Sequence, residues 1–242
     1  MQTGARYWLV GASEGLGRAL AIKLSEAGVE LALSARNADR LQELADALPC
    51  CASVHPVDVS DLQAVKDAAA DVGRIDGVIY AAGVYWPMEA QNWDADAVEA
   101  MCDINFTGAA RVLGTCVPAM IERNAGHVVL IGSLSGFRGL PGAIGYGASK
   151  AGMMHLAENL RAELHKTGVK VQLVNPGFIK TRLTEKNAFN MPFLLEAEDA
   201  ADRVIAVMQS TRFQSNFPRV FSWLFRGANF LPAWAYYWLF GR

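Results

Sequence analysis

Short apolar runs alternate with segments of helical periodicity along this 242-residue chain, and no other feature constrains its fold as much. The runs with the length and side chains of buried strands are residues 7–10, 31–35, 53–57, 77–81, 127–131 and 170–174. Such alternation is typical of β-α-β units around a parallel sheet. We therefore predict an α/β fold of three layers, α/β/α, around a mostly parallel sheet of six to seven strands, the seventh at residues 213–217.

The length, charge and cysteines of the chain limit its domain organisation and its possible partners. A single α/β domain routinely reaches this length, so we expect one catalytic domain over residues 1–210 and a C-terminal extension over residues 211–242. A net charge of −2 gives no overall field that would attract nucleic acid. The four cysteines lack metal-ligand spacing, and no signal peptide precedes the first strand, so we expect no metal and a cytoplasmic location.

A glycine-rich turn follows the first predicted strand. Gly11, Gly15 and Gly17 let the turn tighten and let backbone N–H groups approach a pyrophosphate at the start of the next helix. Ser13 and Leu16 lie in the same turn and join the predicted cofactor contacts. The turn predicts a dinucleotide site.

The end of the second predicted strand indicates which dinucleotide binds. An acidic residue there takes the ribose 2′-hydroxyl of NAD, whereas an arginine accommodates the 2′-phosphate of NADP. This chain has Arg36 and no carboxylate, with Ser34 and Asn37 as candidate helpers. We favour NADP(H) and leave NAD open, because Glu14 in the glycine turn would repel a phosphate if it pointed inward.

Tyr146 and Lys150 lie four residues apart and therefore share one helix face. A nearby ammonium stabilises a phenolate, so this spacing suits a tyrosine that exchanges a proton with a carbonyl or an alcohol.

Together these motifs resemble the short-chain dehydrogenase/reductase family over about residues 5–210. The glycine turn is similar to its Gly-x-x-x-Gly-x-Gly motif, and Tyr146 with Lys150 is similar to its Tyr-x-x-x-Lys motif. Ser133 and Asn105 match the serine and asparagine of its catalytic tetrad. The remaining matches are to cofactor-binding positions, namely Asp58, Val59, Ala82, Gly83, Pro176, Gly177, Ile179 and Thr181.

The resemblance implies a Rossmann-type, doubly wound fold and a defined chemistry. Hydride passes between nicotinamide and a carbonyl carbon while Tyr146 delivers the proton and Ser133 donates a hydrogen bond to the same oxygen. Lys150 is expected to depress the pKa of Tyr146 and to bind ribose hydroxyls, and Asn105 to complete a water-mediated proton path. The resemblance implies no metal.

Two positions depart from the family pattern. Val10 replaces the usual threonine before the first glycine, and Tyr80-Ala81-Ala82-Gly83 replaces Asn-Asn-Ala-Gly. Both lie at neighbouring strand ends, so we expect apolar packing to replace a lost polar contact there.

The substrate side of the chain is apolar. By resemblance, residues 182–195 form a lid over the substrate, and they include Phe189, Met191, Phe193, Leu194 and Leu195. The loop after the fourth predicted strand adds Val84, Tyr85, Trp86 and Met88. These side chains favour a hydrophobic or lipid-like carbonyl or alcohol.

The C-terminal extension combines aromatic residues and arginines, and no acidic residue follows Asp202. Its uncharged stretch, residues 227–241, is shorter than the roughly 20 apolar residues that span a bilayer. Aromatic residues with arginines suit a segment at a membrane interface. The same residues also suit packing on the chain's own domain or on a sister subunit. We favour peripheral attachment to the cytoplasmic membrane face, and we also expect a homo-oligomer, either a dimer or a tetramer.

Two other functions stay open at this point. One is a catalytically silent dinucleotide-binding regulator or scaffold, against which the complete set of Ser133, Tyr146 and Lys150 argues. The other is a soluble dehydrogenase of small polar alcohols.

Overall fold

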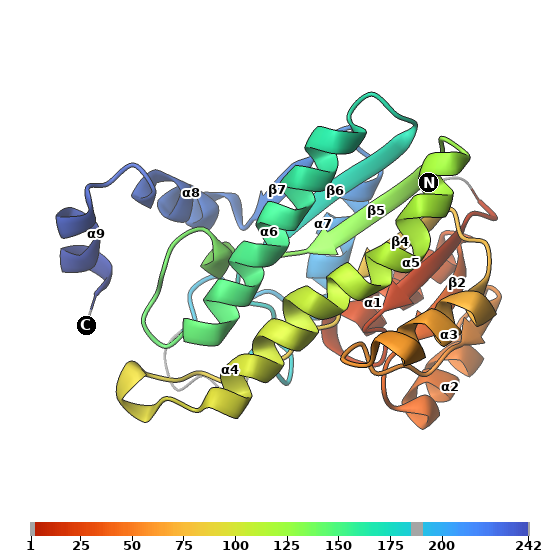
Figure 1. The fold of residues 1–242 in the computed structure, drawn as a ribbon, viewed down its shortest axis with the longest axis horizontal. Helices are drawn as coiled ribbons and strands as arrows, with labels where there is room; N and C mark the ends of the chain where they lie inside the picture. Colours follow the sequence, from red (N-terminus) through yellow and green to blue (C-terminus); the bar gives the residue numbers. More distant parts are fainter. Residues whose placement is uncertain (1–2, 185–190, 242) are drawn as a thin grey trace.

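The structure, a computed structural model, describes residues 3–184 and 191–241 and contains one seven-stranded sheet (Figure 1). All neighbouring strands pair in parallel, in the order β3-β2-β1-β4-β5-β6-β7. The strands are β1 Arg6–Val10, β2 Glu30–Ser34, β3 Ala52–Val54, β4 Gly77–Tyr80, β5 Gly126–Ile131, β6 Val169–Pro176 and β7 Gln214–Phe217. The predicted fold is confirmed, including the seventh strand.

Helices cover both faces of the sheet. The helices of the described residues are α1 Gly15–Glu26, α2 Ala38–Ala47, α3 Leu62–Val72, α4 Ala95–Cys102, α5 Gly108–Glu122, α6 Ile144–Leu164, α7 Ala197–Met208, α8 Arg219–Ala228 and α9 Ala233–Phe240. Helices α1, α2 and α7 pack on one face, and α3, α5 and α6 pack on the other. Three short helical turns, η1 Ala90–Asn92, η2 Asp103–Thr107 and η3 Leu134–Gly136, join them. The strands read as continuous apolar runs because a parallel sheet is buried on both faces.

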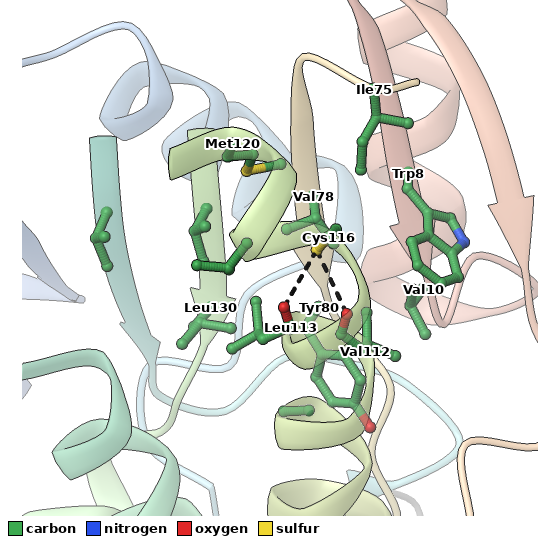
Figure 2. Close-up of a cluster of buried hydrophobic side chains, with 14 of the residues drawn as sticks. Trp8, Val10, Ile75, Val78, Tyr80, Val112, Leu113, Cys116, Met120 and Leu130 are labelled. Atoms are coloured by element: carbon green, nitrogen blue, oxygen red, sulfur yellow. Dashed lines mark hydrogen bonds between the residues drawn. The ribbon is translucent and has the colours of Figure 1, made fainter. Parts of the chain in front are cut away.

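Two hydrophobic clusters fill the spaces between these layers. The first lies between the sheet and helices α3, α5 and α6, and Figure 2 shows Trp8, Val78, Tyr80 and Leu130 of the sheet against side chains of α5. The second lies between the opposite face and helices α1, α2 and α7. The sheet is therefore held rigidly from both sides.

The segment Ala95–Glu122 is the one helical stretch within the described residues that is long and apolar enough to cross a membrane. It comprises α4, η2 and α5, and side chains such as Val112, Leu113 and Met120 are buried in the first cluster. Its apolar composition is accounted for by this packing on the sheet.

The strand order reverses between β1 and β4, because the chain runs outward from β1 to β3 and then returns to β4. Ligands of open α/β sheets bind at the carboxyl ends of the strands beside such a switch point. The fold therefore places a binding site beside Val10 and Tyr80, which pair across β1 and β4.

The C-terminal extension does not begin where the sequence suggested. Residues 214–217 form β7 and belong to the sheet, so the part outside the sheet domain starts with α8 at Arg219. Helices α8 and α9, here called the C-terminal helices, project from the sheet domain (Figure 1).

Candidate active site

The glycine turn lies at the switch point and leaves no room for larger residues. Gly11 has φ +93°, and a Cβ atom there would lie 2.4 Å from the backbone nitrogen of Ala82. A Cβ at Gly17 would lie 1.9 Å from the carbonyl oxygen of Gly11. The residues predicted from the first and fourth strand ends are thus brought together.

Helix α1 begins at Gly15 and has the features of an anion site. No side chain caps its first turn, and that turn contains no acidic residue. Its N–H groups and its dipole therefore favour a negative group above the turn that holds Ser13 and Leu16. The glycine turn and this helix start together fit the pyrophosphate of a dinucleotide.

The carboxylate of Glu14 does not oppose such a group. It forms ion pairs with Arg40 of α2 and with Arg182, whose Nη2 lies 3.0 Å away. Two arginines therefore offset its charge. The repulsion that made NADP less certain from the sequence is accordingly reduced.

Arg36 and Asp58, which are predicted to bind the adenosine end of the cofactor, follow β2 and β3. Arg36 is exposed, as a residue that meets a phosphate must be. Burial alone would raise the pKa of Asp58, but hydrogen bonds from Ser60 and the charges of Arg36 and Arg111 hold it below its usual range. Val59 is buried, and its carbonyl accepts a hydrogen bond from Arg111 at 3.1 Å.

The two candidate helpers of Arg36 have structural roles. Ser34 is fully buried, and its hydroxyl accepts a hydrogen bond from Trp8 and donates one to the His55 carbonyl. The Asn37 side chain caps α2 by accepting from the backbone N–H of Arg40. The expectation that Ser34 helps to bind the cofactor is wrong, because its side chain points into the core.

Ser133, Tyr146 and Lys150 meet where β5 ends and α6 begins. Ser133 and Tyr146 line the same cavity, and the Ser133 hydroxyl acts on Tyr146 so as to lower its pKa. The Lys150 Nζ atom lies 5.8 Å from the centroid of the Tyr146 ring and donates to the Ile131 carbonyl at 2.8 Å. The predicted catalytic residues of the strand and the helix are thus within reach of one another.

Burial sets the protonation of this group. It raises the pKa of Tyr146 to about 12, against the opposing effect of the Ser133 hydroxyl. It also lowers the pKa of the Lys150 ammonium to about 8. The net shift of the Tyr146 pKa is upward because burial disfavours the phenolate, and the depression of that pKa by Lys150 stays a prediction.

Asn105 lies in η2, a π-helical turn between α4 and α5. Its amide is fully buried, accepts from the Val84 N–H at 2.7 Å and donates to the Val84 carbonyl and the Ser149 hydroxyl, both at 3.0 Å. A Cβ at Gly83 would lie 3.3 Å from the Asn105 Oδ1 and 3.8 Å from the Lys150 Nζ. Asn105 therefore fixes the loop that runs past the lysine.

The segment after β6 closes the other side of the site. Pro176 ends the strand, and the Gly177 N–H donates to the Phe217 carbonyl at 2.7 Å. Ile179 is buried, while Thr181 lies against the glycine turn, where a Cβ at Gly15 would come within 2.8 Å of its methyl group. Thr181 is thus brought next to the glycine turn.

A cavity of about 600 Å³ opens beside Ser133 and Tyr146. Its apolar wall includes Tyr85, Trp86 and Met88 from the loop after β4, Phe178 and Leu183 after β6, and Phe221 and Phe225 of α8. Phe193 contacts the Phe221 ring at a centroid distance of 5.9 Å. Phe189 of the predicted lid lies outside the described residues.

Sequence reasoning missed the contribution of α8. Phe221 and Phe225 are spaced four residues apart, so they occupy one face of the helix and line the cavity together. That spacing is visible in the sequence, but only the course of the chain after β7 shows which surface the face meets. Tyr85 lines this cavity, and its ring also lies 4.9 Å from that of Tyr146, a contact that the sequence did not indicate.

Comparison with known proteins decides the family. The family model described as short chain dehydrogenase matches residues 7–191. The chain belongs to the short-chain dehydrogenase/reductase family. An uncharacterised oxidoreductase of Myxococcus xanthus is 40% identical over 201 residues, covering 80% of this chain and 79% of the relative. Another from Staphylococcus epidermidis is 34% identical over 201 residues, covering 81% and 87%.

Solved structures of the family are similar over nearly the whole chain. A short-chain dehydrogenase from Sphingobium yanoikuyae in complex with NADPH has a TM-score of 0.84 and 25% identity, covering 92% of this chain and 91% of that one. A serine dehydrogenase complexed with NADP⁺ has a TM-score of 0.80 and 26% identity, covering 88% and 94%. This protein is therefore a short-chain dehydrogenase/reductase oxidoreductase, and this family uses NAD(P).

Proposed function

We propose that this enzyme uses NADP(H) to interconvert a ketone and a secondary alcohol on a neutral, apolar substrate. The observation that carries the proposal is the apolar cavity, which has Ser133 and Tyr146 in its wall. Its volume of about 600 Å³ is in the range of small-molecule sites.

The cofactor choice rests on charge at the end of β2. Arg36 is exposed there, and the described residues at that strand end include no carboxylate. Arg40, in the first turn of α2, adds positive charge on the same side, although it also pairs with Glu14. Two structural neighbours were solved with NADPH and NADP⁺, which supports the same choice.

The chain's residues would divide the work at the reacting centre. With its pyrophosphate at the glycine turn, the cofactor would supply or accept the hydride through its nicotinamide. Tyr146 holds a proton at neutral pH, so it acts as the acid toward a carbonyl oxygen, and Ser133 donates a hydrogen bond to that oxygen. Lys150 is held by the Ile131 carbonyl close to the loop that Asn105 fixes, where it would bind ribose hydroxyls.

The cavity wall limits the charge of the substrate. Glu89 and Asp94 are its charged residues, and no lysine or arginine of the described chain lines it. A carboxylate or phosphate on the substrate would find no cation there and would face two acidic side chains. A neutral ketone with an apolar body is the better match.

Steady-state oxidation of NADPH and NADH tests this proposal. The panel runs from small polar diketones and hydroxyacids to long-chain 3-oxoacyl esters and steroid ketones, with an inactive Tyr146 variant as control. We expect turnover with NADPH on neutral apolar ketones, with kcat/KM rising as the apolar body lengthens.

Other outcomes would decide against it. Faster turnover of small polar alcohols would show that the wall does not select for apolar substrates. Tight NADPH binding with no turnover on any compound of the panel would favour the catalytically silent regulator.

A further inference from the structure

The C-terminal helix α8 has two apolar faces with different surroundings. Phe221 and Phe225 line the cavity beside the catalytic residues. Val220, Trp223 and Leu224, at helical spacing on another side, are 74%, 73% and 52% exposed. One face is thus accounted for by the chain's own domain, and the other has no partner among the described residues.

Helix α9 and the link before it extend this exposed apolar surface. Phe230, Trp234, Trp238 and Leu239 are 91%, 77%, 80% and 56% exposed. Scattered single apolar residues are ordinary on protein surfaces, whereas several large ones on two successive helices and the link between them indicate an interaction site. We call the seven residues just named, from Val220 to Leu239, the aromatic face.

The aromatic face is held in a fixed orientation. Arg138 donates to the carbonyls of Ala228 and Leu231, and its guanidinium lies 3.9 Å from the centroid of the Tyr236 ring. The buried Tyr236 in turn donates to the Gly139 carbonyl at 2.7 Å. These contacts anchor the inner side of the helices, so the outward direction of the aromatic face is part of the fold.

The charges around this face indicate the kind of surface that it meets. Arg219 and Arg226 are exposed on α8, and no acidic residue follows Asp202 in the sequence. If the face met its own copy across a two-fold axis, arginines would meet a surface with no carboxylate to pair with. Anionic lipid headgroups supply the negative charge, and tryptophan side chains are enriched at the boundary between headgroups and acyl chains.

We propose that the aromatic face docks on an anionic lipid surface. Trp223, Trp234 and Trp238 would enter the interface while Arg219 and Arg226 meet headgroup phosphates. Helix α8 would then have lipid on one side and the substrate cavity on the other, which places the enzyme where an apolar substrate is concentrated. That last consequence rests on the proposed function, whereas the docking itself does not.

Co-sedimentation with vesicles tests the docking without any substrate. The full chain is mixed with vesicles of phosphatidylcholine and phosphatidylglycerol, and with vesicles of phosphatidylcholine alone. One double variant, Trp223→Gln with Trp234→Gln, weakens insertion, and another, Arg219→Gln with Arg226→Gln, removes charge. Leu62→Gln on α3 and Arg74→Gln before β4 are matched controls, because both residues are exposed and lie outside the C-terminal helices.

We expect the wild type and both controls to sediment with the anionic vesicles. The arginine variant should partition about tenfold less onto them and should lose the preference over neutral vesicles. The tryptophan variant should stay in the supernatant with either lipid. Unchanged NADPH binding by each variant verifies that the sheet domain is folded, and the result holds whether or not a substrate is found.

The proposal is overturned if the wild type stays in the supernatant with anionic vesicles, or if the tryptophan variant sediments like the wild type. Light scattering identifies the alternative occupant. A dimer that the tryptophan variant converts to monomers, without lipid binding, would show that a second copy of this chain covers the aromatic face.

Discussion

The hydroxyl of Tyr146 is in surroundings that favour its neutral form. Burial raises its pKa to about 12, so the phenol carries its proton throughout the physiological range. A protonated tyrosine beside a substrate oxygen is ready to act as an acid toward a carbonyl. In the proposed reaction Ser133, which lines the same cavity, would be the second donor to that oxygen.

Tyr146→Phe should bind NADPH about as tightly as the wild type and lose turnover by roughly 10²- to 10⁴-fold. The substitution removes the proton donor and keeps the ring that contacts Tyr85. Fluorescence titration of NADPH and initial rates measure the two quantities separately. A rate near that of the wild type would refute the assignment of Tyr146.

Arg36 should set the preference between the two nicotinamide cofactors. Arg36→Ala should raise the KM for NADPH by about tenfold and leave the KM for NADH nearly unchanged, because an ion pair with the 2′-phosphate is lost. Lys66→Ala is the matched control, since Lys66 is an exposed cation of α3. Equal changes in the KM for both cofactors would show that Arg36 does not bind the 2′-phosphate.

At the scale of elements, β4 is joined to the π-helical turn η2 by Tyr80. Its hydroxyl donates to the Ile104 carbonyl at 2.6 Å, and Gly108 leaves room for it, because a Cβ there would come within 2.6 Å of the same oxygen. The expectation of apolar packing is confirmed for Val10, which is buried in the first cluster. It is incomplete for Tyr80, which is buried but also keeps a polar contact.

Tyr80→Phe should lower the free energy of unfolding by about 1 kcal/mol, because it removes this hydrogen bond from a buried site. Asn105 lies next to Ile104, so we also expect kcat to fall several-fold while NADPH binding changes little. Tyr237→Phe is the control, since Tyr237 is 61% exposed. Chemical denaturation would measure the stability, and equal effects of the two substitutions would contradict the role of the Tyr80 hydroxyl.

At the scale of the whole molecule, His127 ties several parts of the sheet domain together. Its Nδ1 lies 2.8 Å from the Tyr7 hydroxyl of β1, and its Nε2 lies 2.8 Å from the Gln172 Oε1 of β6. The Gln172 amide nitrogen donates to the carbonyls of Val207, Ser210 and Arg212, which orients its oxygen toward the histidine. Burial lowers the pKa of His127 to about 4.

This depressed pKa predicts a loss of stability in acid. Between about pH 6.5 and pH 4 the unfolded chain binds a proton at His127 that the folded chain does not, so stability falls as the pH falls through this range. The contribution is about 3 kcal/mol by pH 4. The free energy of unfolding, measured by denaturation at several pH values, should therefore fall more steeply with decreasing pH for the wild type than for His127→Gln. Parallel curves would show that His127 is not responsible.

Homo-oligomerisation and a cytoplasmic location remain predictions from the sequence. Light scattering on the purified chain measures the first, and cell fractionation the second. The vesicle experiment bears on both, because the same aromatic face that binds lipid in our proposal is the surface that a sister subunit would cover.

The sequence by itself determined the sheet and the glycine turn, and it brought the candidate catalytic residues to notice. Each of these depends on local patterns: apolar runs define buried strands, glycines mark where backbone must come close, and a four-residue spacing places Tyr146 and Lys150 on one helix face. Such patterns depend only on residues that are close in the sequence, so they can be recognised without the tertiary structure. Parallel strands then bring their carboxyl ends to one edge of the sheet.

Only the tertiary structure decided what depends on neighbours far apart in the sequence. It buried Ser34 against Trp8, paired Glu14 with Arg40 and Arg182, and turned Phe221 and Phe225 of α8 toward the cavity. It also buried the Tyr146 phenol and so raised its pKa, because desolvation is set by everything that packs around a group.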